Sequence, residues 1–163
     1  MERTLLLEIL FACVACDGKI DKKEVSLLRK FLITSEQTKT LNVDDILQNC
    51  IKQINEDSNL FFSRIFEKLS VSELSKQDEL ALIKDLIDII ESDNIIDYQE
   101  IKFLKRVKSN LHLTNEELLE IYPDNEDYFV DDIQQKDIDK TFSDLQYNFS
   151  NIGIEDFRVN GQN

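Results

Sequence analysis

The sequence predicts an all-α protein, and three observations lead to this prediction. The 163-residue chain contains only three Gly and one Pro, so few tight turns interrupt it. Leu, Ile, Lys, Glu and Asp dominate its composition, which favours helices over a β-sandwich or barrel. Apolar residues recur at helical spacing and make up 42% of the chain, enough to bury a core. We therefore expect a helical bundle.

The first predicted helix, residues 5–16, is apolar on almost every side, which is typical of a central, buried helix. It should end at Asp17 and Gly18, because glycine adopts the positive φ of a helix C-terminus. The next helix should begin at Asp21, which forms a capping box with Glu24. A single apolar stripe then predicts one buried face.

Two amphipathic helices are predicted in the middle of the chain. Residues 34–42 are polar and predict a loop, after which residues 43–54 and 60–69 carry apolar stripes separated by a polar break at 55–59. Residues 80–90 repeat the apolar character of the first helix. They predict a second central helix, ended at Asp93-Asn94.

The predicted domain ends with two further helices. Asp97 and Glu100 form a second capping box and begin one of them, and Thr114 begins a short last helix that ends before Pro123. We therefore expect a helical domain over residues 1–122.

The composition changes after that domain. Residues 121–163 hold ten acids and three bases. We expect residues 123–163 to form an acidic C-terminal appendage, with a candidate helix at 131–147 and the remainder disordered or ordered only by a partner.

The net charge of the chain limits the classes of partner that it can bind. A formal net charge of -14 repels phosphate backbones and anionic membrane surfaces, which argues against nucleic-acid binding. Cations, or basic side chains of a partner protein, are the ligands that such a field attracts. No stretch has the apolar length to insert into a membrane, and no secretory signal pattern is present, so we expect a cytoplasmic protein. Three Cys do not form a disulfide framework.

The helix-to-helix segment at residues 17–24 occurs twice. Alignment pairs Asp17 with Asp93, Gly18 with Asn94, Ile20 with Ile96, Asp21 with Asp97 and Glu24 with Glu100. This spacing predicts two pseudo-repeated helix-loop-helix halves packed around a shared axis and two buried central helices.

The segments A-C-D-G-K-I-D-K-K-E and E-S-D-N-I-I-D-Y-Q-E resemble the paired acidic motifs of the TerB-like tellurite-resistance family, over about residues 4–121. That family is related to the N-terminal region of DjlA-type cochaperones. The resemblance implies an all-α bundle and a cation-binding or protein-interaction module in stress or tellurite-associated complexes, not an enzyme. Asn94 stands where the family usually has Gly, and the acidic appendage has no counterpart in its core.

The repeated acids are the candidate metal ligands. They are Asp17, Asp21, Glu24, Asp93, Asp97 and Glu100. Their oxygens suit a divalent cation such as Ca²⁺ or Mg²⁺. Helix capping alone also explains the acids at the two helix starts, without any metal. The sequence argues against a high-affinity EF-hand, because Cys13 and Ala15 occupy positions where that loop needs oxygen ligands.

No residue is a candidate for catalysis. Cys13 and Cys16 form a C-x-x-C at the C-terminal end of a buried helix, where the dipole opposes a thiolate, so we interpret them as reduced core residues. His112 is the single histidine and has no local catalytic partner. No Gly-rich phosphate loop occurs.

We therefore expect a non-enzymatic TerB-like module that binds a protein partner, with a basic segment as the electrostatically favoured ligand, and that offers its carboxylates to a divalent cation. Two alternatives remain: a chaperone-linked adaptor acting in trans, and an acidic immunity or inhibitor protein. A hydrolase that uses paired carboxylates on a metal is a further alternative, against which the scarcity of His and Gly argues. The sequence does not specify the oligomeric state.

Overall fold

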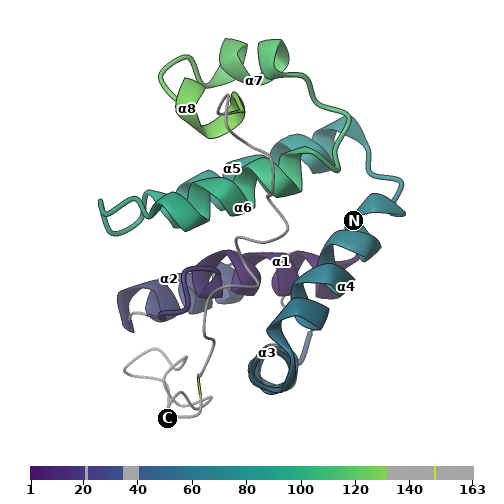
Figure 1. Ribbon diagram of the computed structural model, residues 1–163, viewed down its shortest axis with the longest axis vertical. Helices are drawn as coiled ribbons and strands as arrows, with labels where there is room; N and C mark the ends of the chain where they lie inside the picture. The colour runs from purple at the N-terminus through teal and green to yellow at the C-terminus, as the bar shows by residue number, and fades with distance from the viewer. Residues whose placement is uncertain (21, 35–40, 132–148, 150–163) are drawn as a thin grey trace.

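The computed structural model describes residues 1–20, 22–34, 41–131 and 149 (Figure 1). Within these ranges the chain forms eight helices and no strands. The helices are α1 (Arg3–Ala15), α2 (Lys22–Thr34), α3 (Val43–Glu56), α4 (Ser58–Ser70), α5 (Lys76–Ile90), α6 (Tyr98–Lys108), α7 (Asn115–Ile121) and α8 (Glu126–Phe129). The all-α fold predicted from composition and periodicity is confirmed.

Helix α1 is the centre of the bundle. Every residue from Leu5 to Ala15 is buried, and the helix packs against α2, α3, α4, α5 and α6. Figure 1 shows α5 and α6 together on one side of α1 and α2, with α3 and α4 packed as a pair at one end of α1. A helix that is apolar on every side removes its surface from water only when other helices enclose it, which explains the central position of α1.

Helix α5 packs along α1 but keeps one face in solvent. Leu82, Ile83 and Leu86 are buried, whereas Lys84 and Asp88 are exposed and form an ion pair with each other. The helix begins at Lys76, four residues before the apolar run, because the Ser75 side chain accepts a hydrogen bond from the Asp78 N–H and caps it.

The polar segment between α3 and α4 is mostly helical, not a five-residue break. Only Asp57 interrupts the two helices. Its N–H donates to the Gln53 carbonyl, and its side chain accepts from the Leu60 N–H at 2.9 Å. One residue therefore closes α3 and caps α4, which allows both helices to extend into polar sequence.

Parts of the segment after residue 122 pack on the helical body. Tyr128 and Phe129 in α8 are buried, and α8 contacts α6 and α7. The Tyr128 hydroxyl donates to Glu91 Oε1 at 3.1 Å. Phe149 is 2% exposed, and its N–H donates to Asn55 Oδ1 at 2.6 Å. The candidate helix at 131–147 lies outside the described residues except at Asp131, and the division of the chain at residue 122 stays a prediction.

None of the helices in the described ranges has the length and apolarity that crossing a membrane requires.

Candidate functional site

The loops that follow α1 and α5 share one local conformation. Asp17 Oδ1 accepts the Lys19 N–H at 2.7 Å, and Asp93 Oδ1 accepts the Ile95 N–H at 2.9 Å. The residue inside each of these turns has a positive φ, 80° at Gly18 and 60° at Asn94. Asparagine tolerates this left-handed region better than most residues, so the second loop reproduces the first without glycine.

The second loop ends in the predicted capping box. Asp97 Oδ1 accepts the Gln99 N–H at 2.7 Å, and the Asp97 N–H donates to Glu100 Oε2 at 3.1 Å. The matching box in the first loop depends on Asp21, which lies outside the described residues. Both Asp97 and Glu100 therefore have a structural role at the start of α6.

Four of the six candidate acids influence one another electrostatically. We call Asp17, Glu24, Asp97 and Glu100 the acidic cluster. Glu100 is 4% exposed, and its burial is the main cause that raises its pKa to about 8. The hydrogen bond from the Asp97 N–H lowers this pKa, and the charges of Glu24, Asp17 and Asp97 raise it. Glu100 therefore holds a proton at neutral pH.

Asp17 shows the same coupling from the other loop. Burial raises its pKa, and the charge of Asp97 adds to this, while the hydrogen bond from the Lys19 N–H opposes it. Acids from the α1–α2 connection and from the α5–α6 connection therefore act on each other across the bundle. The charge of Lys19 lowers the pKa of Asp17.

The other two candidate acids, Asp93 and Asp21, do not belong to the acidic cluster. Asp93 is not among the groups that shift Glu100 or Asp17, and it lies beside lysines of α2. Asp21 lies outside the described residues. Among the residues that the structure describes, no group of three or more His, Cys, Asp or Glu side chains is arranged to hold a metal ion. The oxygen donors suit Ca²⁺ or Mg²⁺ in kind, but the described side chains do not form a ligand set.

The two thiols of the C-x-x-C lie beneath the acidic cluster. Cys13 and Cys16 are fully buried and are free thiols. Burial raises the pKa of both well above the ordinary value, and nearby acids, Glu100 among them, raise it further. A thiol in this environment stays protonated and is a poor nucleophile, in agreement with the interpretation of these residues as core.

His112 takes part in a structural contact. Nδ1 of its exposed ring lies 2.9 Å from Oε1 of the buried Glu79. The backbone N–H of His112 donates to the same carboxylate at 3.0 Å. This contact joins the turn after α6 to the first turns of α5.

Sequence reasoning missed an apolar surface next to the acidic cluster. We call Ile95, Ile96 and Tyr98 the apolar tip. Their exposed fractions are 71%, 51% and 52%. The alignment of the two loops contained a signal for it, because Ile95 stands where the first loop has Lys19. Ile96 is also exposed, whereas its counterpart Ile20 packs against the core.

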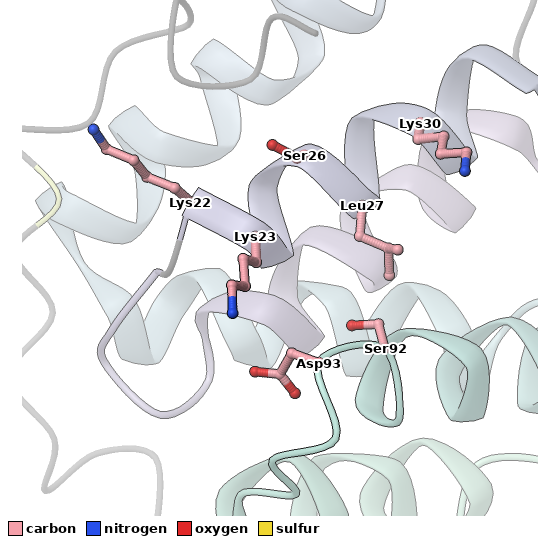
Figure 2. Close-up of a pocket in the computed structure, with 7 residues that line it drawn as sticks. All are labelled: Lys22, Lys23, Ser26, Leu27, Lys30, Ser92 and Asp93. Atoms are coloured by element: carbon pink, nitrogen blue, oxygen red, sulfur yellow. The ribbon is translucent and has the colours of Figure 1, made fainter. Parts of the chain in front are cut away.

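A pocket of about 460 Å³ lies between α2 and the turn that follows α5. Figure 2 shows Lys23 and Leu27 extending from α2 toward the turn that carries Ser92 and Asp93. In the same view, Lys22 and Ser26 point away from that turn. Sequence reasoning placed these lysines on a solvated helix face and did not anticipate a pocket.

Comparison with protein-family models places most of the chain in a family. A family described as tellurite resistance protein TerB matches residues 3–121, which include α1 to α7. No curated protein and no solved structure shows a significant match to the chain.

Proposed function

The chain belongs to the TerB family of tellurite resistance proteins, and from this premise we propose that it is a non-enzymatic module that binds a basic segment of a partner protein. The observation that carries the proposal is the position of the apolar tip beside the acidic cluster on the α5–α6 loop. Asp97 belongs to the cluster and lies between Ile96 and Tyr98 of the tip. One short segment therefore offers both charge and apolar contact area.

The charge supports a basic partner. The chain has a net charge of -14, so its long-range field draws basic surfaces toward it and repels acidic ones. Glu100 retains a proton at neutral pH because its acidic neighbours and its burial disfavour a further negative charge. A lysine or arginine placed beside the cluster would favour the ionised form, so binding would release a proton.

The apolar tip supports a direct protein contact. The Ile95 and Ile96 side chains are mostly in water although their loop is fixed by the Asp93 turn and the Asp97 cap. Burying exposed apolar side chains on binding is favourable by about 25 cal/mol for each Å² removed from water. The acids would steer the partner, and the tip would supply contact energy.

Site-specific crosslinking tests this proposal. A benzophenone amino acid is placed at position 95 in one variant and at the exposed position 52 of α3 in a matched control, and both are expressed in cells exposed to tellurite. We expect a defined crosslinked partner at position 95 only. The partner is then purified, and its affinity is measured at increasing salt for the native chain and for Ile95→Ser/Ile96→Ser.

The expected result is binding that weakens with salt and with the double substitution. Equal crosslinking at both positions, or a partner that is acidic at the contact, would contradict the proposal. A chaperone component as the captured partner would support the adaptor alternative, and a toxin or nuclease would support the immunity alternative.

Divalent-cation binding is the second candidate, and the raised pKa of Glu100 is the observation that favours it. A cation would displace the proton that Glu100 holds below about pH 8, so affinity should increase as pH rises toward that value. Titration with Ca²⁺ or Mg²⁺, followed by NMR at Asp17, Gly18 and Glu100 at pH 6 and pH 8, measures this. Amide shifts that are absent at both values would remove the candidate.

A further inference from the structure

Phe149 is buried in the core although it belongs to no helix. It is 2% exposed and is part of the hydrophobic core of the bundle. Its backbone N–H donates to Oδ1 of Asn55 at 2.6 Å, and 94 positions of sequence separate the two residues. Phe149 therefore contacts the helical body through its ring and through its main chain.

The acceptor of this hydrogen bond is a side chain at the end of α3. Asn55 is the last residue but one of the helix, and its side chain is exposed. Helix α3 packs on α1 and α4 (Figure 1), whereas Lys52, Asn55 and Glu56 are exposed. Lys52 and Glu56 pair with each other at 3.9 Å, so this stretch of α3 has no net charge. The surface at Asn55 therefore suits an uncharged anchor such as an aromatic ring.

The two contacts of Phe149 are of the kind that recognises a peptide. A side-chain oxygen that accepts a main-chain N–H binds the backbone of any residue, and a buried aromatic ring supplies the selectivity. Asn55 makes the first contact, and the ring of Phe149 makes the second. The ligand class is therefore a non-helical peptide segment that carries an aromatic residue.

The surface and the residue that occupies it belong to different parts of the chain. The TerB match covers residues 3–121 and contains all of α3, whereas Phe149 lies 28 residues beyond its end. The family core therefore supplies the surface at Asn55, and the segment that follows the core supplies the occupant.

The length of the connection sets the affinity that this contact needs. Phe149 follows Asp131 by 18 positions. A tether of this length gives its ligand an effective concentration on the order of 1 mM. Occupancy of about 90% at that concentration requires a dissociation constant of about 0.1 mM for the free peptide. The same peptide should therefore bind measurably in trans once Phe149 is removed.

We propose that the surface at Asn55 is a docking site for a non-helical peptide segment with an aromatic residue, and that the segment at Phe149 is its internal ligand. The site holds the acidic C-terminal appendage to the helical body through one ring and one hydrogen bond. The inference uses α3, whereas the proposed function uses the loops after α1 and α5, so it does not depend on that function.

Fluorescence polarisation with the full chain tests the proposal. The probe is a labelled peptide with the sequence of residues 144–154, D-L-Q-Y-N-F-S-N-I-G-I. We expect saturable binding to the Phe149→Ala chain with a dissociation constant of about 0.1 mM or lower. The native chain should bind the peptide about tenfold more weakly, because its own Phe149 competes. A peptide that itself carries Phe149→Ala should bind the Phe149→Ala chain at least about tenfold more weakly.

A matched pair of variants tests the hydrogen bond. Phe149→Ala/Asn55→Ala should bind the peptide about threefold to tenfold more weakly than Phe149→Ala, the order expected for one lost hydrogen bond. Phe149→Ala/Asn59→Ala changes an exposed asparagine of α4 and should bind as Phe149→Ala does. Circular dichroism verifies that these variants fold.

A second measurement needs no substitution at Phe149 and stays decisive if Phe149→Ala does not fold. Chymotrypsin cleavage after Phe149 is followed by mass spectrometry in the native chain, Asn55→Ala and Asn59→Ala. Cleavage requires release of the docked residue, so Asn55→Ala alone should increase its rate several-fold.

Four outcomes would overturn the proposal. They are no binding of the peptide to a folded Phe149→Ala chain, equal binding by the native chain, equal binding of the peptide without the aromatic ring, and equal cleavage rates in Asn55→Ala and Asn59→Ala. A native chain that is dimeric, and becomes monomeric in Phe149→Ala, would assign the site to the segment of a second copy and overturn the internal assignment.

Discussion

Glu100 should make the stability of this protein depend on pH, and Glu100→Gln should remove much of that dependence. The folded-state pKa of Glu100 is raised from 4.5 to about 8, mainly by burial. Because the folded pKa lies above the ordinary value, the bound proton of Glu100 stabilises the folded protein. This contribution to the free energy of unfolding is complete below about pH 4.5 and is lost as pH rises through about 8. Glutamine is neutral at every pH and can still accept the Asp97 N–H that Glu100 Oε2 accepts.

The size of this pH dependence follows from the pH range between the unfolded and folded pKa values of Glu100. Each pH unit in which the folded protein holds the proton and the unfolded chain does not is worth about 1.4 kcal/mol. Between pH 5.5 and pH 8, the free energy of unfolding of the native chain should therefore fall by about 3 kcal/mol relative to Glu100→Gln. The variant should be the more stable protein above pH 8.

Urea denaturation, followed by circular dichroism at half-unit steps of pH, measures the difference. Glu120→Gln, an exposed charge removal on α7, is the control for the change in net charge and should give a difference that varies little with pH. A constant difference between the native chain and Glu100→Gln from pH 5.5 to 8.5 would show that Glu100 ionises normally. The account of the acidic cluster would then be wrong.

Substitutions at three further positions test other contacts of the fold. Phe149→Ala should lower the free energy of unfolding by about 3 kcal/mol, because it leaves a cavity where a buried aromatic ring packs. A change near zero in urea denaturation would show that Phe149 does not pack on the helical body. Asn94→Ala should cost about 1 kcal/mol and Asn94→Gly should not, because φ is 60° there; equal thermal midpoints for the two would contradict a left-handed turn. Lys68→Ala should cost about 1–3 kcal/mol, because it leaves the nearly buried Glu8 carboxylate without its partner at 2.7 Å, whereas Lys52→Ala, at an exposed pair, should cost less than about 1 kcal/mol; equal losses in urea would refute this.

Local sequence predicted the elements well where the signal was itself local. The continuous apolar run of α1, the Asp97–Glu100 box and the short helix that begins after Thr114 all have the structure that their spacing indicates. The prediction failed between α3 and α4, where polar residues suggested a loop. One aspartate, Asp57, closes α3 and caps α4 there, so both helices extend into polar sequence.

The candidate site was predicted as six acids, of which those at the two helix starts also have a capping role, and tertiary structure divides them differently. Residue spacing identified the capping role of Glu100, but it cannot show which side chains become buried. Packing of α6 against α1 buries Glu100 close to the charges of the other loop, whereas Asp93 lies beside Lys23 of α2. The environment of each carboxylate is set by helices that are distant in the chain.

The sequence by itself determined the all-α fold, the family and the repeated acidic loops, because helix periodicity, capping and turn chemistry are encoded within a few consecutive residues. Only the tertiary structure decided that the two loops share one electrostatic environment, that Ile95 and Ile96 stay in solvent, and that lysines of α2 line a pocket. Burial and proximity arise from how helices pack, and no short stretch of sequence contains that information.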